Sequence, residues 1–169
     1  TPPPAPDVRN FQVVTSEDGS KSLQLEVFKP QDDISGTDFI RVRIIAFNPE
    51  TDELYRYDGG LNSFDGHLDF NAIDLNNPNA DGYVEGSLPL DEFAPDAIYK
   101  ISYVTVQDSA ANQKTWANPD YDSADWRHLT NGSSNFLPSL TQHSVFASAS
   151  GPVDNTPPPA PDVRNFQVV

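Results

Sequence analysis

The 169-residue chain has no cysteine, no methionine and no long apolar run. A domain of this size buries enough surface to fold without disulfide bonds, so the missing cysteine does not indicate a reducing compartment. No stretch approaches the roughly 18–20 apolar residues of a membrane-spanning helix. The first residues also lack the regions of a signal peptide, so any export signal is expected elsewhere in a longer parent protein.

Basic residues are scarce: ten Lys and Arg stand against 25 Asp and Glu, which gives a formal net charge of −15. Such a polyanion repels nucleic acid and anionic lipid surfaces, so neither nucleic acid nor membrane insertion is expected. It also repels itself and stays extended unless cations screen or bridge it. The charge is compatible with specific cation binding and equally with the general surface charge of a halophilic or marine protein.

Recognisable catalytic motifs are also missing. The chain has no Gly-x-Ser-x-Gly elbow, no phosphate-binding loop and no zinc signature. Its three histidines are scattered and follow no metal-ligand spacing. Acid pairs for glycoside hydrolysis are diagnosed by their separation in space, and nothing in the sequence places two of them in one cleft. We therefore predict no enzymatic activity and no catalytic residue.

The sequence TPPPAPDVRNFQVV occupies positions 1–14 and recurs, letter for letter, at positions 156–169. This offset of 155 residues far exceeds the roughly 20–50 residues of solenoid repeats, so it predicts whole domains joined by linkers. Four prolines within the first six residues fix φ and remove backbone donors, which favours a stiff linker. The expected organisation is a linker at 1–6, a repeat domain at 7–150, and a linker with the first strand of the next repeat at 151–169.

The repeat itself is rich in short β-strand patterns and has almost no helical periodicity. We expect clear strands at Val8–Val14, Leu23–Phe28, Phe39–Phe47, Tyr83–Leu90, Ala97–Gln107, Gln113–Ala117 and His143–Ser148, and weaker ones at Glu53–Tyr57 and His67–Ala72. A slip in alternation predicts a bulge near Ser102. Together these features predict an all-β fold, an immunoglobulin-like antiparallel β-sandwich with long loop insertions at Gly59–Gly82 and Asn118–Gln142.

Several segments then carry a resemblance to a known family. In order along the chain they are Asp33-Ile-Ser-Gly36, Asp81–Pro89, Tyr99–Asn112 and Asp154–Pro158. With these segments the chain resembles the immunoglobulin-like tandem repeats of giant bacterial surface adhesins of the repeats-in-toxin and biofilm-associated types. The resemblance covers Asp33 to Asn112 and the linker. One departure is Ala111, because such repeats commonly have glycine there.

This resemblance implies a non-catalytic extender role. Many modules in series would hold a ligand-binding tip away from the bacterial surface, each module contacting neighbouring repeats, with Ca²⁺ at the junctions. Ca²⁺ takes six to eight oxygen ligands, and carboxylates on both sides of a linker would lock it. For Asp154 and Asn155, the alternative is that these side chains only cap the turn before Thr156. The expected ligands are Asp7, Asp32, Asp33 and Asp108 near the N-terminal junction, and Asp154 and Asn155 at the other end.

The runner-up interpretation is a carbohydrate-binding module. Its candidate residues are Trp116, Tyr121, Trp126 and Phe136, which crowd one region of the sequence. If exposed, these side chains would form a platform on which sugars stack. If buried, they would cover one end of the sandwich with the long insertion, which is the commoner fate of aromatic residues.

The duplicated segment raises a separate question, because Val8–Val14 already fills the first-strand position. We expect the second copy to project from the domain as the link to a following repeat. Two alternatives are displacement of the first copy and insertion into another molecule.

Overall fold

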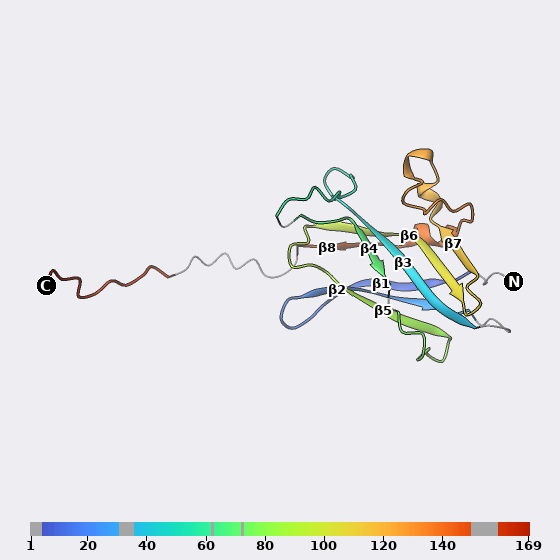
Figure 1. Ribbon diagram of the computed structural model, residues 1–169, viewed down its shortest axis with the longest axis horizontal. Coiled ribbons are helices and arrows are strands. Elements are labelled where there is room, and N and C mark those ends of the chain that lie inside the picture. Colours follow the sequence, from blue (N-terminus) through green and yellow to red (C-terminus); the bar gives the residue numbers. More distant parts are fainter. Residues whose placement is uncertain (1–4, 31–35, 62, 72, 150–158) are drawn as a thin grey trace.

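The computed structural model describes residues 5–30, 36–61, 63–71, 73–149 and 159–169. Two antiparallel sheets face each other (Figure 1). One sheet has the order β1-β2-β5, formed by β1 (Val8–Thr15), β2 (Lys21–Phe28) and β5 (Tyr83–Pro89). The other has the order β4-β3-β6-β7, formed by β4 (His67–Phe70), β3 (Thr37–Phe47), β6 (Ala97–Asp108) and β7 (Gln113–Ala117), and β8 (Ser144–Ala147) also pairs with β6. The expected all-β sandwich is confirmed.

The strand order corresponds to strands A-B-E facing C′-C-F-G of immunoglobulin-like sandwiches. The last strand of that scheme is split in two. β7 pairs with residues 103–107 of β6, whereas β8 pairs with residues 97–100 of the same strand. The insertion between β7 and β8 is the expected one at Asn118–Gln142. The strand expected at Glu53–Tyr57 does not form, and only one isolated bridge joins Leu54 to Phe47.

The core between the sheets follows from the alternation of side chains along each strand. In β2, Leu23, Leu25 and Val27 are buried and alternate with half-buried residues. In β3, residues Ile40 and Val42 face the same core. Burying a side chain of this size stabilises the fold by about 1.5–3 kcal/mol relative to exposure. The period-2 pattern therefore fixes which face of each sheet points inward.

The long insertion covers the outer face of the second sheet. It contains three short 3₁₀ turns, η1 (Pro119–Tyr121), η2 (Ala124–Trp126) and η3 (Pro138–Gln142). Tyr121 stacks on Phe47 of β3 with ring centroids 6.0 Å apart, and Ile45 and Leu129 join this second apolar cluster. The C-terminal half of β3 is therefore buried on both faces.

This packing decides the fate of the crowded aromatic residues. Trp116 is 4% exposed and Tyr121 is 7% exposed, while Trp126 and Phe136 are half-buried. Burial, the commoner expectation, is confirmed for the first two. The four side chains together do not form an exposed sugar-stacking platform.

The bulge predicted near Ser102 is confirmed at that residue. The β3–β6 register passes from Arg43 opposite Tyr103 to Ile44 opposite Ile101, which leaves Ser102 as the extra residue. Its hydroxyl donates a hydrogen bond to the carbonyl of Leu129, and its own carbonyl accepts one from the amide of Asn118. The bulge therefore anchors the insertion to the sheet.

A tight turn joins β6 to β7. The carboxylate of Asp108 accepts hydrogen bonds from the amides of Ala110 and Asn112, at 2.9 and 2.8 Å, and from the side-chain amide of Asn112. Ala111 has φ +66°, in the left-handed region. That conformation costs an L-residue about 1–2 kcal/mol, and glycine adopts it readily. The departure noted in the sequence is therefore a strained position.

We predict that Ala111→Gly raises the free energy of unfolding by about 1 kcal/mol, because it removes this steric cost. Urea unfolding of the variant and the wild type measures the difference. Ala110→Gly is the matched control in the same turn, at a residue without positive φ, and it should give no increase. Equal stability of the Ala111→Gly variant and the wild type would contradict the strain argument.

The chain enters and leaves the sandwich at opposite ends. We name the leading end after the start of β1, where the amide of Phe28 bonds to the carbonyl of Asp7. At the trailing end, Lys21 Nζ donates to Ser148 Oγ at 2.5 Å, and the amide of Ala149 donates to Asp96 Oδ1 at 2.6 Å. Because Lys21 begins β2 beside the end of β1, these contacts place the end of β8 at the β1–β2 turn.

The described part of the C-terminal copy, residues 159–169, forms no strand and is exposed throughout. It lies beyond the trailing end, away from both sheets (Figure 1). The described part of the second copy thus lies outside both sheets, and its role as the link to a following repeat stays a prediction. None of the helices among the described residues has the length and apolar character needed to cross a membrane.

Candidate functional site: an acidic groove between β4 and β5

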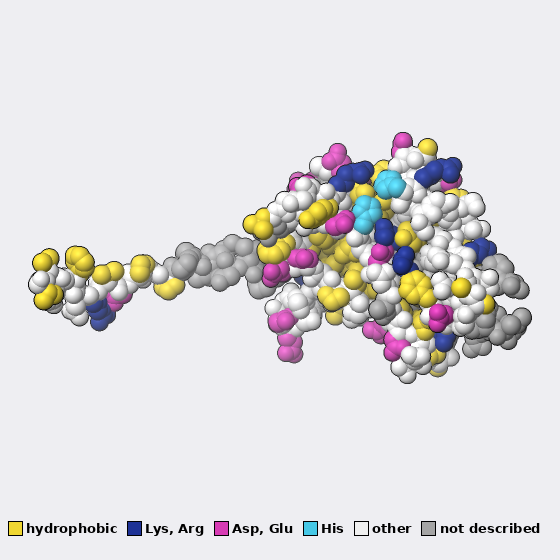
Figure 2. All heavy atoms as spheres, in the orientation of Figure 1, with side chains coloured by type: hydrophobic (Ala, Val, Ile, Leu, Met, Phe, Trp, Pro, Cys, Tyr) yellow, Lys and Arg dark blue, Asp and Glu magenta, His cyan; other side chains and the backbone are white. Residues whose placement is uncertain are grey.

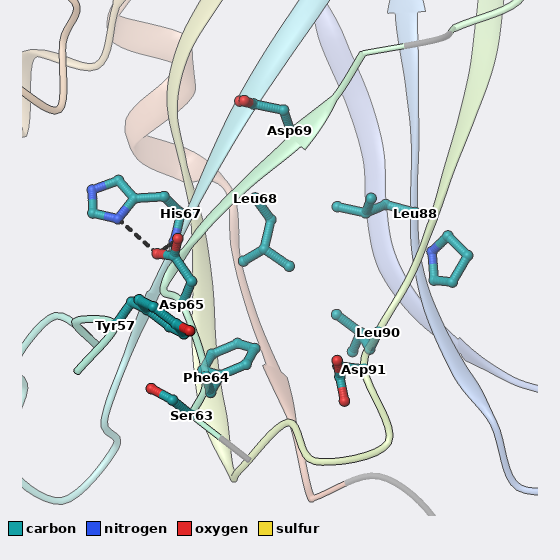
Figure 3. A pocket seen from close by; sticks show the side chains of 11 residues that line it. Tyr57, Ser63, Phe64, Asp65, His67, Leu68, Asp69, Leu88, Leu90 and Asp91 are labelled. Carbon is teal, nitrogen blue, oxygen red and sulfur yellow. Dashed lines mark hydrogen bonds and ion pairs between the residues drawn. The ribbon is translucent and has the colours of Figure 1, made fainter. Parts of the chain in front are cut away.

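One candidate site is a groove where the two sheets separate, between β4 of one sheet and β5 of the other. It has a volume of about 600 Å³ (Figure 3). One wall comes from β4 and the loop before it, and the other from the end of β5. The lining residues are Tyr57, Ser63, Phe64, Asp65, His67, Leu68, Asp69, Leu88, Pro89, Leu90 and Asp91.

The floor of the groove is apolar. The side chains of Phe64, Leu68, Leu88 and Leu90 point into one shared space (Figure 3), and all four belong to or pack against the main core. Tyr57 lies at the rim and is 64% exposed. An apolar floor with an exposed aromatic ring is suited to a flat ligand face, such as that of a sugar.

The rim carries three carboxylates, and each is held by a neighbour. Asp69 forms a two-point ion pair with Arg43, including Nη2–Oδ2 at 2.9 Å. This hydrogen-bonded contact raises the pKa of Arg43, against the opposing effect of its burial. Asp65 accepts a hydrogen bond from the amide of His67 at 2.9 Å and contacts its Nδ1 at 3.1 Å, and Asp91 accepts one from Phe93. The three aspartates are thus ordered, but the carboxylate of Asp69 is paired with Arg43 and points away from the apolar floor (Figure 3).

The groove continues beyond Asp69 and Leu88 into a second hollow of about 410 Å³. Its walls add Asn71 and Asp74 on one side and Glu85 on the other. The combined groove is long and lined with carboxylates and amides along its edges. Its chemistry suits a neutral or cationic ligand rich in hydrogen-bonding groups.

Gly66 sets the position of the β4 wall. Its carbonyl accepts a hydrogen bond from the amide of Ala46 at 2.8 Å, and its amide donates to Tyr55 at 3.0 Å. A Cβ atom at Gly66 would lie 2.4 Å from the carbonyl oxygen of Tyr55 and 2.9 Å from that of Ala46. Only glycine therefore allows the backbone to pass here and place Asp65 and His67 on the rim.

Sequence reasoning missed this groove. Tyr57 lies in a segment expected as a strand, and Phe64 lies in the loop insertion expected at Gly59–Gly82. His67 begins the weaker strand expected at His67–Ala72, which the structure has as β4. The structure also brings His67 within 6.3 Å of His128, ring centroid to ring centroid, and stacks His128 on Trp126. The two histidines lie side by side on one face (Figure 2). Their separation along the chain gave no signal of this pairing.

The expected calcium ligands fall into two groups. Asp32, Asp33, Asp154 and Asn155 lie outside the described residues. Asp7 and Asp108 both lie at the leading end, beside the end of β2 and at the end of β6. Within the described ranges, no group of three or more His, Cys, Asp or Glu side chains is arranged to hold a metal ion.

The local surroundings of Asp7 and Asp108 differ. Asp7 is exposed and accepts a hydrogen bond from the hydroxyl of Tyr83, which raises the pKa of that tyrosine. Asp108 is 1% exposed, and its oxygens accept the hydrogen bonds that close the β6–β7 turn. In the structure, Asp108 therefore caps the β6–β7 turn. Its metal ligation stays a prediction.

Comparison of the chain with known protein families, with curated proteins and with solved structures gives no match.

We predict that Gly66→Ala lowers the free energy of unfolding by about 2 kcal/mol or more, because backbone atoms cannot give way as a flexible side chain can. Thermal and urea unfolding measure the effect. Gly60→Ala is the control, since its Cβ would meet only the mobile side chain of Asp58, and it should stay within about 0.5 kcal/mol of the wild type. If the Gly66→Ala variant is as stable as this control, the carbonyl groups of Tyr55 and Ala46 do not lie as close to Gly66 as described.

Proposed function

We propose that the chain is a structural extender module, one repeat of the stalk of a large exported bacterial adhesin. Each module adds length, and neighbouring repeats of the same chain are its partners. The proposal includes no catalytic step. It places the protein outside the cell, on the bacterial surface, in agreement with the resemblance described above.

The observation that carries this proposal is the position of the two ends of the sandwich. The chain enters at the leading end and leaves at the trailing end, where Lys21 and Asp96 hold Ser148 and Ala149. Modules linked in this way advance by a whole sandwich length per repeat. A fold whose ends lay side by side would instead double back. The 155-residue period supplies the repetition that makes such an advance useful.

Charge supports the same proposal. The duplicated segment adds one Asp and one Arg, so the whole net charge of −15 belongs to one repeat. Repulsion between like-charged modules opposes collapse of an array, and divalent cations at the junctions would stiffen it. Asp7, exposed at the leading end, is the described residue that best fits a junction ligand for Ca²⁺.

The test is to prepare chains of one, two and three complete repeats and measure their maximum dimension by small-angle X-ray scattering. We expect a constant increment per repeat, close to the length of the sandwich and its linker. Millimolar Ca²⁺ should narrow the distribution of lengths relative to excess chelator and raise the melting temperature by several degrees, with no such effect of Mg²⁺.

Two results would count against this proposal. A maximum dimension that grows much less than in proportion to the number of repeats would mean folded-back modules and would exclude the extender role. Identical lengths and melting temperatures in calcium and chelator would exclude the calcium part alone.

A second candidate function, carbohydrate binding, is favoured by the groove between β4 and β5. The aromatic cluster first considered for this role is largely buried, but Tyr57 is 64% exposed beside an apolar floor and a hydrogen-bonding rim. Stacking of a sugar on such a ring contributes useful affinity, and the acidic rim excludes sulfated and uronic-acid glycans.

For this candidate, neutral oligosaccharides should bind the wild type and lose at least ten-fold in affinity with Tyr57→Ala. Isothermal titration calorimetry measures the binding. The variant should keep the wild-type melting temperature because the side chain is exposed. Phe93→Ala, at another exposed ring outside the groove, serves as the matched control. Equal affinity of the Tyr57→Ala variant and the wild type would remove the groove from consideration.

A further inference from the structure

The two copies of the duplicated segment lie in opposite environments. In β1, Val8 is 3% exposed and Phe11 is 9% exposed. The corresponding residues of the second copy, Val163 and Phe166, are 76% and 91% exposed. The described part of the C-terminal segment therefore presents the apolar face of a core strand to solvent.

The backbone of the duplicated C-terminal segment shares one positive φ angle with β1. Asn10 has φ +53° and its counterpart Asn165 has φ +54°, both in the left-handed region that non-glycine residues seldom adopt. In β1 this residue belongs to a bulge, because Asn10 and Phe11 together oppose a single residue of β2. The left-handed φ of this asparagine therefore occurs in the C-terminal segment as well as in the sheet.

The position that β1 occupies is accessible from the side. β1 is an edge strand. Among the described strands, its hydrogen-bonded neighbour is β2, and β8 of the other sheet also contacts it. Its side-chain partners are Glu26 for Arg9 and His143 for Phe11, whose rings meet edge to face. In the free segment, Arg164 pairs instead with the adjacent Asp162. Because residues 163–169 are identical to residues 8–14, they can make every side-chain contact that those residues make.

We propose that residues 159–169 act as a donor strand that fills the β1 position of a second copy of this chain. The segment leaves one molecule at the trailing end, and β1 begins at the leading end. A second copy placed end to end therefore receives the segment in the required direction without a reversal of the chain. The resulting contact is heterologous, so it extends into open-ended chains and does not stop at a dimer.

This inference goes beyond the proposed extender function. In an array the segment would fill the β1 position of the next repeat of the same chain, whereas in this inference the receiving sandwich belongs to a separate molecule. In the wild type, β1 competes with the donor segment of another molecule for the same position beside β2. Because a short turn tethers β1 to β2, its effective concentration is in the millimolar range. At micromolar concentration the wild type is therefore a monomer. If β1 alone is weakened, residues 159–169 of another molecule take its place in the sheet.

The test uses the full chain with three substitutions. Phe11→Asp disables the first copy, Phe166→Asp disables the second, and the double variant disables both. Sedimentation velocity from micromolar to millimolar concentration, with melting curves of the same samples, gives the two measurements. We expect Phe166→Asp to be monomeric and to melt with the wild type. Phe11→Asp should associate and show a melting temperature that rises with concentration, whereas the double variant should remain monomeric with the lowest melting temperature.

Two results would overturn the proposal. If Phe11→Asp and the double variant have the same mass and the same melting curve at every concentration, the second copy does not replace β1. If Phe11→Asp is more stable than the double variant but monomeric throughout, the C-terminal segment inserts into its own molecule and not into a second molecule.

A covalent trap provides an independent measurement that leaves Phe11 intact. In β1, Gln12 lies opposite Gln24, so its counterpart Gln167 should lie opposite Gln24 of the receiving copy. The chain has no cysteine, and oxidised Gln24→Cys/Gln167→Cys protein at high concentration should form disulfide-linked ladders. Gln24→Cys/Val168→Cys is the out-of-register control, since the residue equivalent to Val168 pairs with Leu23. Ladders of equal yield in both variants, or none in the first, would contradict the proposed register.

Discussion

The pairing of β3 with β6 is the constraint on which the rest of the structure depends. These are the two longest strands, and their side chains are buried between the sheets on one face. At Ile45 and Phe47, the other face of β3 is buried by the insertion. The bulge at Ser102 lies in the middle of this ladder, and its hydroxyl and carbonyl hold the insertion in place. Both apolar clusters therefore depend on one register.

Much of this fold could be predicted from the sequence, because short-range alternation carries the information. The period-2 pattern of Leu23, Leu25 and Val27 determines which face is buried, and the slip near Ser102 revealed the bulge. The segment at Glu53–Tyr57 misled because an alternating pattern alone does not provide a partner strand. Only Leu54 finds one, through a single bridge to Phe47.

The groove could not be predicted for a physical reason. Its walls belong to different sheets, and its shape depends on how β4 and β5 separate, which no local pattern encodes. Gly66 illustrates the difficulty: the sequence shows a glycine in a polar stretch, whereas its role is set by carbonyl groups of Ala46 and Tyr55. Four of the six expected calcium ligands lie outside the described residues. The sequence also did not show that Asp108 accepts the hydrogen bonds that close its turn.

The opposite placement of the two chain ends has a mechanical consequence. A force applied along an array would pull the start of β1 toward the leading end and the end of β8 toward the trailing end. Both strands would then be drawn along their own axes, against β2 and β6 respectively. In this geometry the interstrand hydrogen bonds share the load together, whereas peeling from one end would break them one at a time. Strands in this orientation would resist tension along the chain, and the bonds of Lys21 and Asp96 at the trailing end are the first that such a load would reach there.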